Sequence, residues 1–133
     1  MIGNIHHLGL TVRDADRNAA WYHEVLGFER TGEYRAADGS RRKVFLRHEG
    51  LSLRLGLTEH WPGRQVPFDE TSVGLDHLAF AVATRRELSE WERRFTAADV
   101  TYTPTAPANS IPGAAVLVFR DPDNIQLELF FEP

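Results

Sequence analysis

The chain has 133 residues, of which 42% are hydrophobic, 11% aromatic and 26% charged, and its formal net charge is −4. A chain of this length and composition buries enough apolar surface to form a core without disulfide bonds. The absence of cysteine excludes a disulfide framework, a thiolate zinc site and a cysteine nucleophile.

Charge and hydropathy patterns also restrict the partners. The densest basic run, Arg41-Arg42-Lys43, is too short for the basic stripe that nucleic-acid binding requires, so we expect no nucleic-acid partner. No apolar run approaches the roughly 20 residues of a membrane-spanning helix, and the N-terminus has no signal-peptide pattern. We therefore expect a cytoplasmic protein with no membrane partner.

The first half of the chain predicts a strand, a helix and three further strands. Leu8, Leu10 and Val12 alternate with smaller or polar residues, which is typical of a half-buried strand. A helix is predicted from about Asp14 to Leu26, where Gly27 ends it. The further strands are predicted near residues 28–35, 42–48 and 51–57, with a hairpin turn at Asp38-Gly39.

The second half predicts the same order of elements after a linker rich in proline and glycine at about 58–73. Its helix begins at Thr84-Arg85-Arg86-Glu87, a capping-box pattern, and Trp91, like Trp21 in the first helix, is interpreted as a core anchor. Asp121-Pro122-Asp123-Asn124 predicts a turn before the last strand. The strands of this half are predicted near residues 75–82, 99–103, 115–120 and 124–131.

An internal repeat relates the two halves. The segment 5–12 resembles 75–82 at an offset of 70, and 51–55 resembles 125–129 at an offset of 74. The shared order predicts an α+β fold of two βαβββ modules, about 3–57 and about 74–131, within one domain covering residues 1–133. In both first strands a histidine is followed by small residues on the face opposite the bulky apolar one, which indicates the lining of a cavity.

Three side chains of this lining suit a divalent metal. His7 and His77 occupy matched positions in the repeat, and alternation in the last strand places Glu128 on the corresponding polar face. Two imidazoles and one carboxylate suit Fe(II), Mn(II), Co(II), Ni(II) or Zn(II) and leave open positions for substrate. The alternative is that the histidines are hydrogen-bonded structural residues and that Glu128 pairs with Arg54.

Other residues have more than one interpretation. Arg54 either pairs with Glu128, binds an anionic substrate or fills a sheet face. The aromatic residues that either line a substrate pocket or belong to the core are Phe45, Tyr102 and Phe119. His6 is expected on the face opposite His7, and His23 and His48 are expected to be solvated.

The chain resembles the vicinal oxygen chelate superfamily, also described as the glyoxalase/bleomycin resistance protein/dioxygenase group, over about residues 3–131. The similar segments are His7-Leu8-Gly9-Leu10-Thr11-Val12, Ala20-Trp21-Tyr22 through Leu26-Gly27-Phe28, Gly74-Leu75-Asp76-His77-Leu78-Ala79-Phe80 and Asp121-Pro122-Asp123-Asn124-Ile125-Gln126-Leu127-Glu128-Leu129. The resemblance implies that the modules form an open, cavity-containing β-barrel with the helices outside. It also implies a divalent metal held by His7, His77 and Glu128, a substrate that chelates this metal, and a homodimer.

The resemblance further implies a fourth ligand, a carboxylate, in metal-dependent glyoxalase I enzymes. We expect that position to correspond to Arg54, which cannot bind a metal because its guanidinium presents only donors.

The sequence thus favours a metal-dependent enzyme, a lyase or isomerase or a dioxygenase, acting on a small oxygenated substrate. Glu128 is the only general base identified for it. The alternatives are a resistance protein that sequesters an antibiotic without chemistry and a binder of another small molecule.

Overall fold

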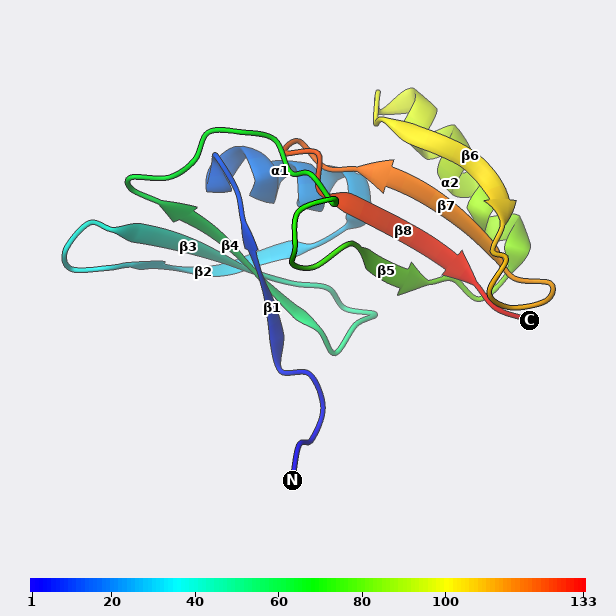
Figure 1. Ribbon diagram of the computed structural model, residues 1–133, viewed down its shortest axis with the longest axis horizontal. Helices are drawn as coiled ribbons and strands as arrows, with labels where there is room; N and C mark the ends of the chain where they lie inside the picture. Colours follow the sequence, from blue (N-terminus) through cyan, green and yellow to red (C-terminus); the bar gives the residue numbers. More distant parts are fainter. The chain divides into compact units, whose positions relative to one another are not determined.

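The computed structural model describes residues 1–133 and divides the chain into two units, Met1–Val66 and Pro67–Pro133 (Figure 1). The first unit contains β1 (His7–Thr11), α1 (Ala15–Leu26), β2 (Glu29–Arg35), β3 (Arg41–Arg47) and β4 (Arg54–His60). The second contains β5 (Leu78–Ala81), α2 (Arg85–Ala97), β6 (Tyr102–Pro107), β7 (Ala115–Arg120) and β8 (Gln126–Phe131). Neither helix is long and apolar enough to cross a membrane.

The two units have the same topology. The strand order is β1-β4-β3-β2 in one sheet and β5-β8-β7-β6 in the other. In each sheet the first strand pairs in parallel with the last, whereas the other pairs are antiparallel. The predicted α+β fold of two βαβββ modules is therefore confirmed.

Each helix covers one face of its own sheet, and the core of each unit lies between them. In the first unit the largest buried side chains are Tyr22, Phe28, Val44, Leu46, Leu55 and Leu57. In the second they are Leu88, Phe95, Leu117, Phe119 and Leu127. Trp21 and Trp91, which we predicted to be core anchors, are only half-buried. The fully buried aromatic residues of the two helices are Tyr22 and Phe95.

The predicted helix ends are confirmed. The side chain of Asp14 accepts a hydrogen bond from the Arg17 N–H at the start of α1, and Gly27 ends this helix at a φ of 80°, which favours glycine. At the start of α2, Thr84 and Glu87 form both hydrogen bonds of the capping box.

The boundaries of β4 differ from the prediction, because the strand covers Arg54–His60 and not 51–57. The apolar alternation ends at Leu57, so the sequence placed the linker at Thr58. In the structure Thr58 and Glu59 continue the strand and are buried, at 7% and 8% exposure. The carboxylate of Glu59 is tolerated there because it has specific partners on the helix side of the sheet.

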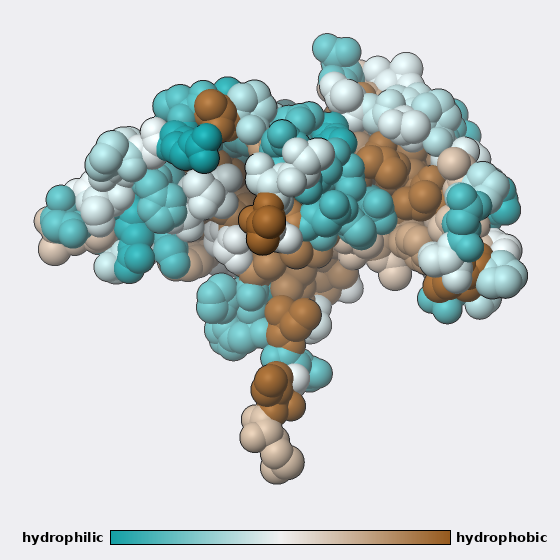
Figure 2. Space-filling view, viewed as in Figure 1, coloured by the Kyte–Doolittle hydropathy of each residue, from teal (hydrophilic) through white to brown (hydrophobic).

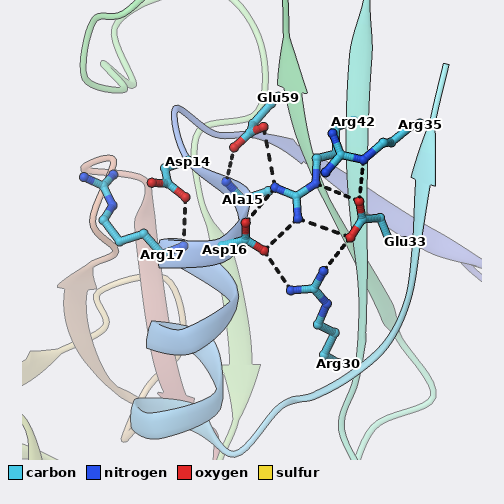
Figure 3. Close-up of polar contacts among 9 residues, drawn as sticks. All are labelled: Asp14, Ala15, Asp16, Arg17, Arg30, Glu33, Arg35, Arg42 and Glu59. Carbon is cyan, nitrogen blue, oxygen red and sulfur yellow. Dashed lines mark hydrogen bonds and ion pairs between the residues drawn. The ribbon is translucent and has the colours of Figure 1, made fainter. Parts of the chain in front are cut away.

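A buried arginine connects α1 to the sheet of the first unit (Figure 3). Arg42 donates hydrogen bonds to both carboxylate oxygens of Asp16, at 2.7 and 2.8 Å, and to Glu33, at 3.0 and 3.2 Å. Beside it, Glu59 accepts a 2.6 Å hydrogen bond from the backbone N–H of Ala15 at the start of α1. The Arg42 guanidinium holds the pKa of Asp16 well below its usual range and lowers the pKa of Glu33.

Replacing this arginine tests the network. We expect Arg42→Met to lower the free energy of unfolding by about 2–3 kcal/mol, because it removes the buried cation shared by Asp16 and Glu33 and leaves them only the more exposed Arg30 and Arg35. This is less than for a fully buried pair, since the Asp16 side chain is 57% exposed. The matched control Arg35→Met removes a 65% exposed arginine that binds only Glu33 and is expected to change stability by less than about 0.5 kcal/mol. Chemical denaturation measures both.

The same variants predict a pH dependence. A carboxyl whose pKa is depressed in the folded state contributes stability above its unfolded pKa, and this contribution is lost as the pH falls through the folded value. The difference between wild type and Arg42→Met is therefore expected to shrink below about pH 4. A difference that stays constant from neutral pH to about pH 2 would contradict this account of the network.

Candidate functional site

His77 and Glu128 lie together in the second unit. His77 Nε2 is 3.5 Å from Glu128 Oε2, and His77 Nδ1 is 2.7 Å from Asp76 Oδ1. The Glu128 side chain is 14% exposed and that of His77 is 41% exposed. One imidazole nitrogen therefore faces a carboxylate that is available as a metal ligand, while the other is held by a second carboxylate, an arrangement typical of metal-binding histidines.

The sheet explains this pairing. His77 immediately precedes β5, and β5 is in parallel register with β8, where Glu128 is the partner of Ala79. Leu127 and Leu129 are buried on the α2 side, so alternation sends Glu128 to the other face. Its neighbours across the strands there, Ala79 and Val118, carry no charge, and Figure 2 shows hydrophobic side chains over β7 and β8.

A chain of polar contacts extends from Asp76, the partner of His77, to Arg120. The Gln126 amide donates to Asp76 Oδ1 at 3.3 Å, and Arg120 donates to the Gln126 oxygen at 2.9 Å. Arg120 also binds Glu70 through two hydrogen bonds of 2.7 and 3.0 Å, which lowers the pKa of Glu70 to about 2. The sequence alone does not predict the roles of these residues, because their spacing along the chain carries no motif.

His7 has an equivalent neighbour in the first unit. We expected His6 to point away from His7, but the two Nδ1 atoms are 2.9 Å apart and the rings meet edge-on at 5.1 Å. The strand alternation behind that expectation does not apply, because β1 begins only at His7. His6 and Asp76 stand at matched repeat positions, so in both units the residue before the histidine contacts its Nδ1.

The expected equivalence of Arg54 and Glu128 is wrong by two residues. Gly9 in β1 pairs with Gly56, whereas Ala79, its counterpart in β5, pairs with Glu128. The next backbone contacts agree, since Val12 N donates to Thr58 O and Val82 N donates to Phe130 O. The counterpart of Glu128 is therefore Gly56. The alternating leucines around Arg54 fit two registers equally well, because a strand repeats every two residues.

Arg54 instead borders a hollow of about 400 Å³ in the first unit. The side chains that line it include His6, His7, Thr31, Phe45, Arg47 and Arg54. Phe45, which we predicted to contact substrate, is 39% exposed there. Arg54 makes no ion pair within its unit.

The other two predicted pocket residues belong to the second unit. Phe119 is fully buried and its ring centroid is 4.6 Å from that of Phe95, so it lies in the core, one of the two alternatives that the sequence left open. The Tyr102 hydroxyl is 2.8 Å from Thr96 Oγ1, which holds this ring against α2.

Two further histidines have structural contacts where we expected solvation. His48 packs against Phe28 at a ring separation of 5.2 Å, and its Nδ1 accepts a hydrogen bond from Gly50 N at 3.0 Å. His23 Nδ1 is 2.9 Å from the carbonyl oxygen of Phe28, although its side chain is 55% exposed.

The geometry at His77 predicts its tautomer. Because the contact of Nδ1 with Asp76 is much shorter than that of Nε2 with Glu128, we expect neutral His77 to carry its proton on Nδ1. Long-range ¹H–¹⁵N correlation spectra at about pH 8 distinguish the tautomers. Asp76→Ala should shift the population toward the Nε2-protonated form. Wild-type His77 found protonated on Nε2 alone would contradict the assignment.

Comparison with solved structures identifies similar proteins over the whole chain. A glyoxylase/bleomycin resistance protein/dioxygenase domain from Frankia sp. EAN1pec is 34% identical, with 100% of both chains covered and a TM-score of 0.87. A glyoxalase family protein from Enterococcus faecalis is 25% identical, with 96% of both chains covered and a TM-score of 0.78.

A third structure has a more distant sequence. A variant of the fosfomycin resistance protein FosX from Listeria monocytogenes, in complex with Mn(II) and 1S,2S-dihydroxypropylphosphonic acid, is 23% identical. The match covers 97% of this chain and 92% of that chain, with a TM-score of 0.72. Comparison with curated proteins finds no match. The model of the Glyoxalase/Bleomycin resistance protein/Dioxygenase superfamily matches residues 4–129, and the chain therefore belongs to this superfamily.

Proposed function

We propose that the protein is a metal-dependent enzyme that acts on a small, oxygenated, metal-chelating substrate. The observation that carries this proposal is the group of Asp76, His77 and Glu128, in which two carboxylates flank one imidazole at 2.7 and 3.5 Å. A structural histidine needs only one such partner. Here Asp76 already satisfies Nδ1, and Nε2 still faces a largely buried carboxylate.

The proposed ligands are His77 and Glu128 of the second unit and His7 of the first. The structure contains no group of three such side chains that could hold a metal ion. His7 enters the proposal because it matches His77 in the repeat and because its Nδ1 is likewise held by the preceding residue. A neutral imidazole that donates its proton from Nδ1 presents the lone pair of Nε2, which suits Mn(II), Fe(II), Co(II), Ni(II) or Zn(II).

Each residue of the group has a defined task. Asp76 keeps the His77 ring oriented and its Nδ1 protonated. Glu128 contributes one oxygen as a ligand, and its other oxygen is the group available to accept a proton from the substrate. Gly56, which replaces a fourth protein ligand, leaves room for substrate oxygens. A bound divalent ion would supply Lewis-acid polarisation for a lyase or isomerase, or redox chemistry for a dioxygenase.

Metal analysis of variants tests the proposal. We expect about one divalent ion per chain in the wild type, loss of this ion in His77→Ala and Glu128→Gln, and about 10–100-fold weaker binding in Asp76→Asn. The matched control is His23→Ala, which removes a histidine on α1 and should leave the metal content unchanged. Elemental analysis and titration with Mn(II) measure these effects.

The outcome separates the candidate functions. Undiminished metal binding in a His7→Ala/His77→Ala double variant would refute the site. A protein that binds no metal but still holds a bulky antibiotic would instead support the sequestering resistance function. Oxygen consumption by the Fe(II)-loaded protein with a catechol would favour a dioxygenase over a lyase or isomerase.

The homodimer expected from the family is a further part of the proposal. β1 and β5 are edge strands of their sheets, and edges of this kind favour pairing with another chain. Exposed apolar side chains lie just before each of them, with Ile2 at 99%, Ile5 at 76% and Leu75 at 49% exposure. Figure 2 shows the hydrophobic surface of the N-terminal segment that precedes β1.

Sedimentation equilibrium tests the dimer. We expect a mass about twice the 15.1 kDa of the chain at micromolar concentration, because association covers these apolar side chains. Ile2→Ser/Ile5→Ser should raise the dissociation constant, whereas Ile111→Ser, in a loop of the second unit remote in sequence from both edge strands, should not. A wild-type mass of one chain would refute the proposal.

A further inference from the structure

Three strands of the first unit place His7, Arg54 and Arg47 in one row across the sheet. Arg54 is in register with His7 on β1 and with Arg47 on β3. The adjacent residues Leu46 and Leu55 are buried on the α1 side, so alternation directs this row to the opposite face, where the hollow lies. Side chains in direct register start about 5 Å apart, so the side chains of Arg47 and Arg54 begin side by side on this face.

The two arginines have no counter-ion within their unit. The carboxylate in register with Arg47 is that of Glu29, but it contacts His23 Nδ1 at 3.3 Å instead. No carboxylate lines the hollow. On the other face of the same sheet, by contrast, Arg42 binds two carboxylates. Like charges in direct register across strands destabilise a sheet, and nothing in this unit offsets the effect.

The second unit shows which partners the two arginines of the first unit lack. By strand register, Arg54 corresponds to Gln126 and Arg47 corresponds to Arg120, since each pair faces across its antiparallel strands. In the second unit these positions form a closed network in which Arg120 binds Glu70 and Gln126, and Gln126 binds Asp76. The first unit has His6 at the position of Asp76. The matched set in the first unit therefore keeps one arginine, gains a second in place of Gln126, and has a histidine in place of the carboxylate of Asp76.

We propose that Arg47 and Arg54 bind an anionic group of the substrate, a carboxylate or a phosphorus oxyanion, beside His7. Two guanidinium groups offer several N–H donors that match the oxygens of such groups, and charge-assisted hydrogen bonds of this kind are the stronger ones. Phe45 and Thr31 on the same hollow leave space for the uncharged part of the molecule. The inference rests on the proposed function only in calling the bound molecule a substrate. Binding of the anion itself does not require the metal.

Titration of the full-length protein after removal of metals by a chelator tests the site. The probes are methylphosphonate and acetate, with propane-1,2-diol as the neutral control, and calorimetry together with arginine Nε–Hε NMR signals reports binding. We expect 1:1 binding of at least one anion, and about tenfold or greater loss of affinity in Arg54→Gln and in Arg47→Gln. Arg54→Gln also recreates the residue of the second unit, so it should fold.

Two further variants distinguish a site from a general field. Arg41→Gln removes the same charge from the same face of β3, outside the hollow, and should change affinity by less than about twofold. His6→Asp supplies the carboxylate that the second unit has, so it should compete with the anion and abolish binding. The melting temperature of each variant confirms folding.

The result that overturns the proposal is a wild type that binds neither anion, or an Arg41→Gln variant weakened as much as Arg54→Gln. Binding of methylphosphonate over acetate identifies a tetrahedral oxyanion, and the reverse identifies a carboxylate. Because these measurements use metal-free protein, the anion site can fail while metal binding at His77 and Glu128 persists, and the converse also holds.

Discussion

Parallel pairing of the first and last strands of each module determines where the chemistry of this protein can occur. It brings residues about 50 positions apart into register, and it requires a crossover that places the helix on one face only. The other face then receives every second residue of four strands. In the second unit this rule alone brings the histidine before β5 to Glu128 on β8, with small or uncharged neighbours around them.

The same rule explains how much the sequence could predict. The helix caps and the alternation of leucines give the elements and the buried face, and so they also give the face to which Glu128 belongs. Register is different, because a shift of two residues preserves every in-or-out assignment. The alignment of Arg54 with Glu128 satisfied the pattern, and the strand pairs Gly9–Gly56 and Ala79–Glu128 reveal Gly56 as the counterpart.

Residues whose role depends on a partner far along the chain were beyond the sequence for a related reason. The burial of Glu59 is favourable only because the N-terminus of α1 and Arg42 lie beside it, and neither neighbour is encoded in the local pattern. The sequence around Asp76 gives no sign of its role, which follows only from its contact with His77. Local alternation thus identified the proposed ligands but not the side chains that contact them.

The two modules have kept one backbone and diverged in charge. At matched positions the second unit has Asp76, Gln126 and Arg120, which satisfy one another, and the first has His6, Arg54 and Arg47, which do not. A repeat provides two equivalent frameworks, so one can specialise in holding a cation through carboxylate and imidazole while the other specialises in recognising an anion. An internally compensated network and an uncompensated one at the same positions are what such a division predicts.

The two-residue correction also removes an electrostatic conflict from the proposed centre. If Arg54 stood at the position matching Glu128, a fixed positive charge would face any metal ion bound there and oppose its binding. Gly56 occupies that position instead, and Arg54 lies two residues earlier on the same face, about 6.6 Å along the strand. That separation is comparable to the span of a small chelating molecule. In the first unit, the uncharged position of Gly56 and the guanidinium group of Arg54 thus belong to one face of β4, two residues apart.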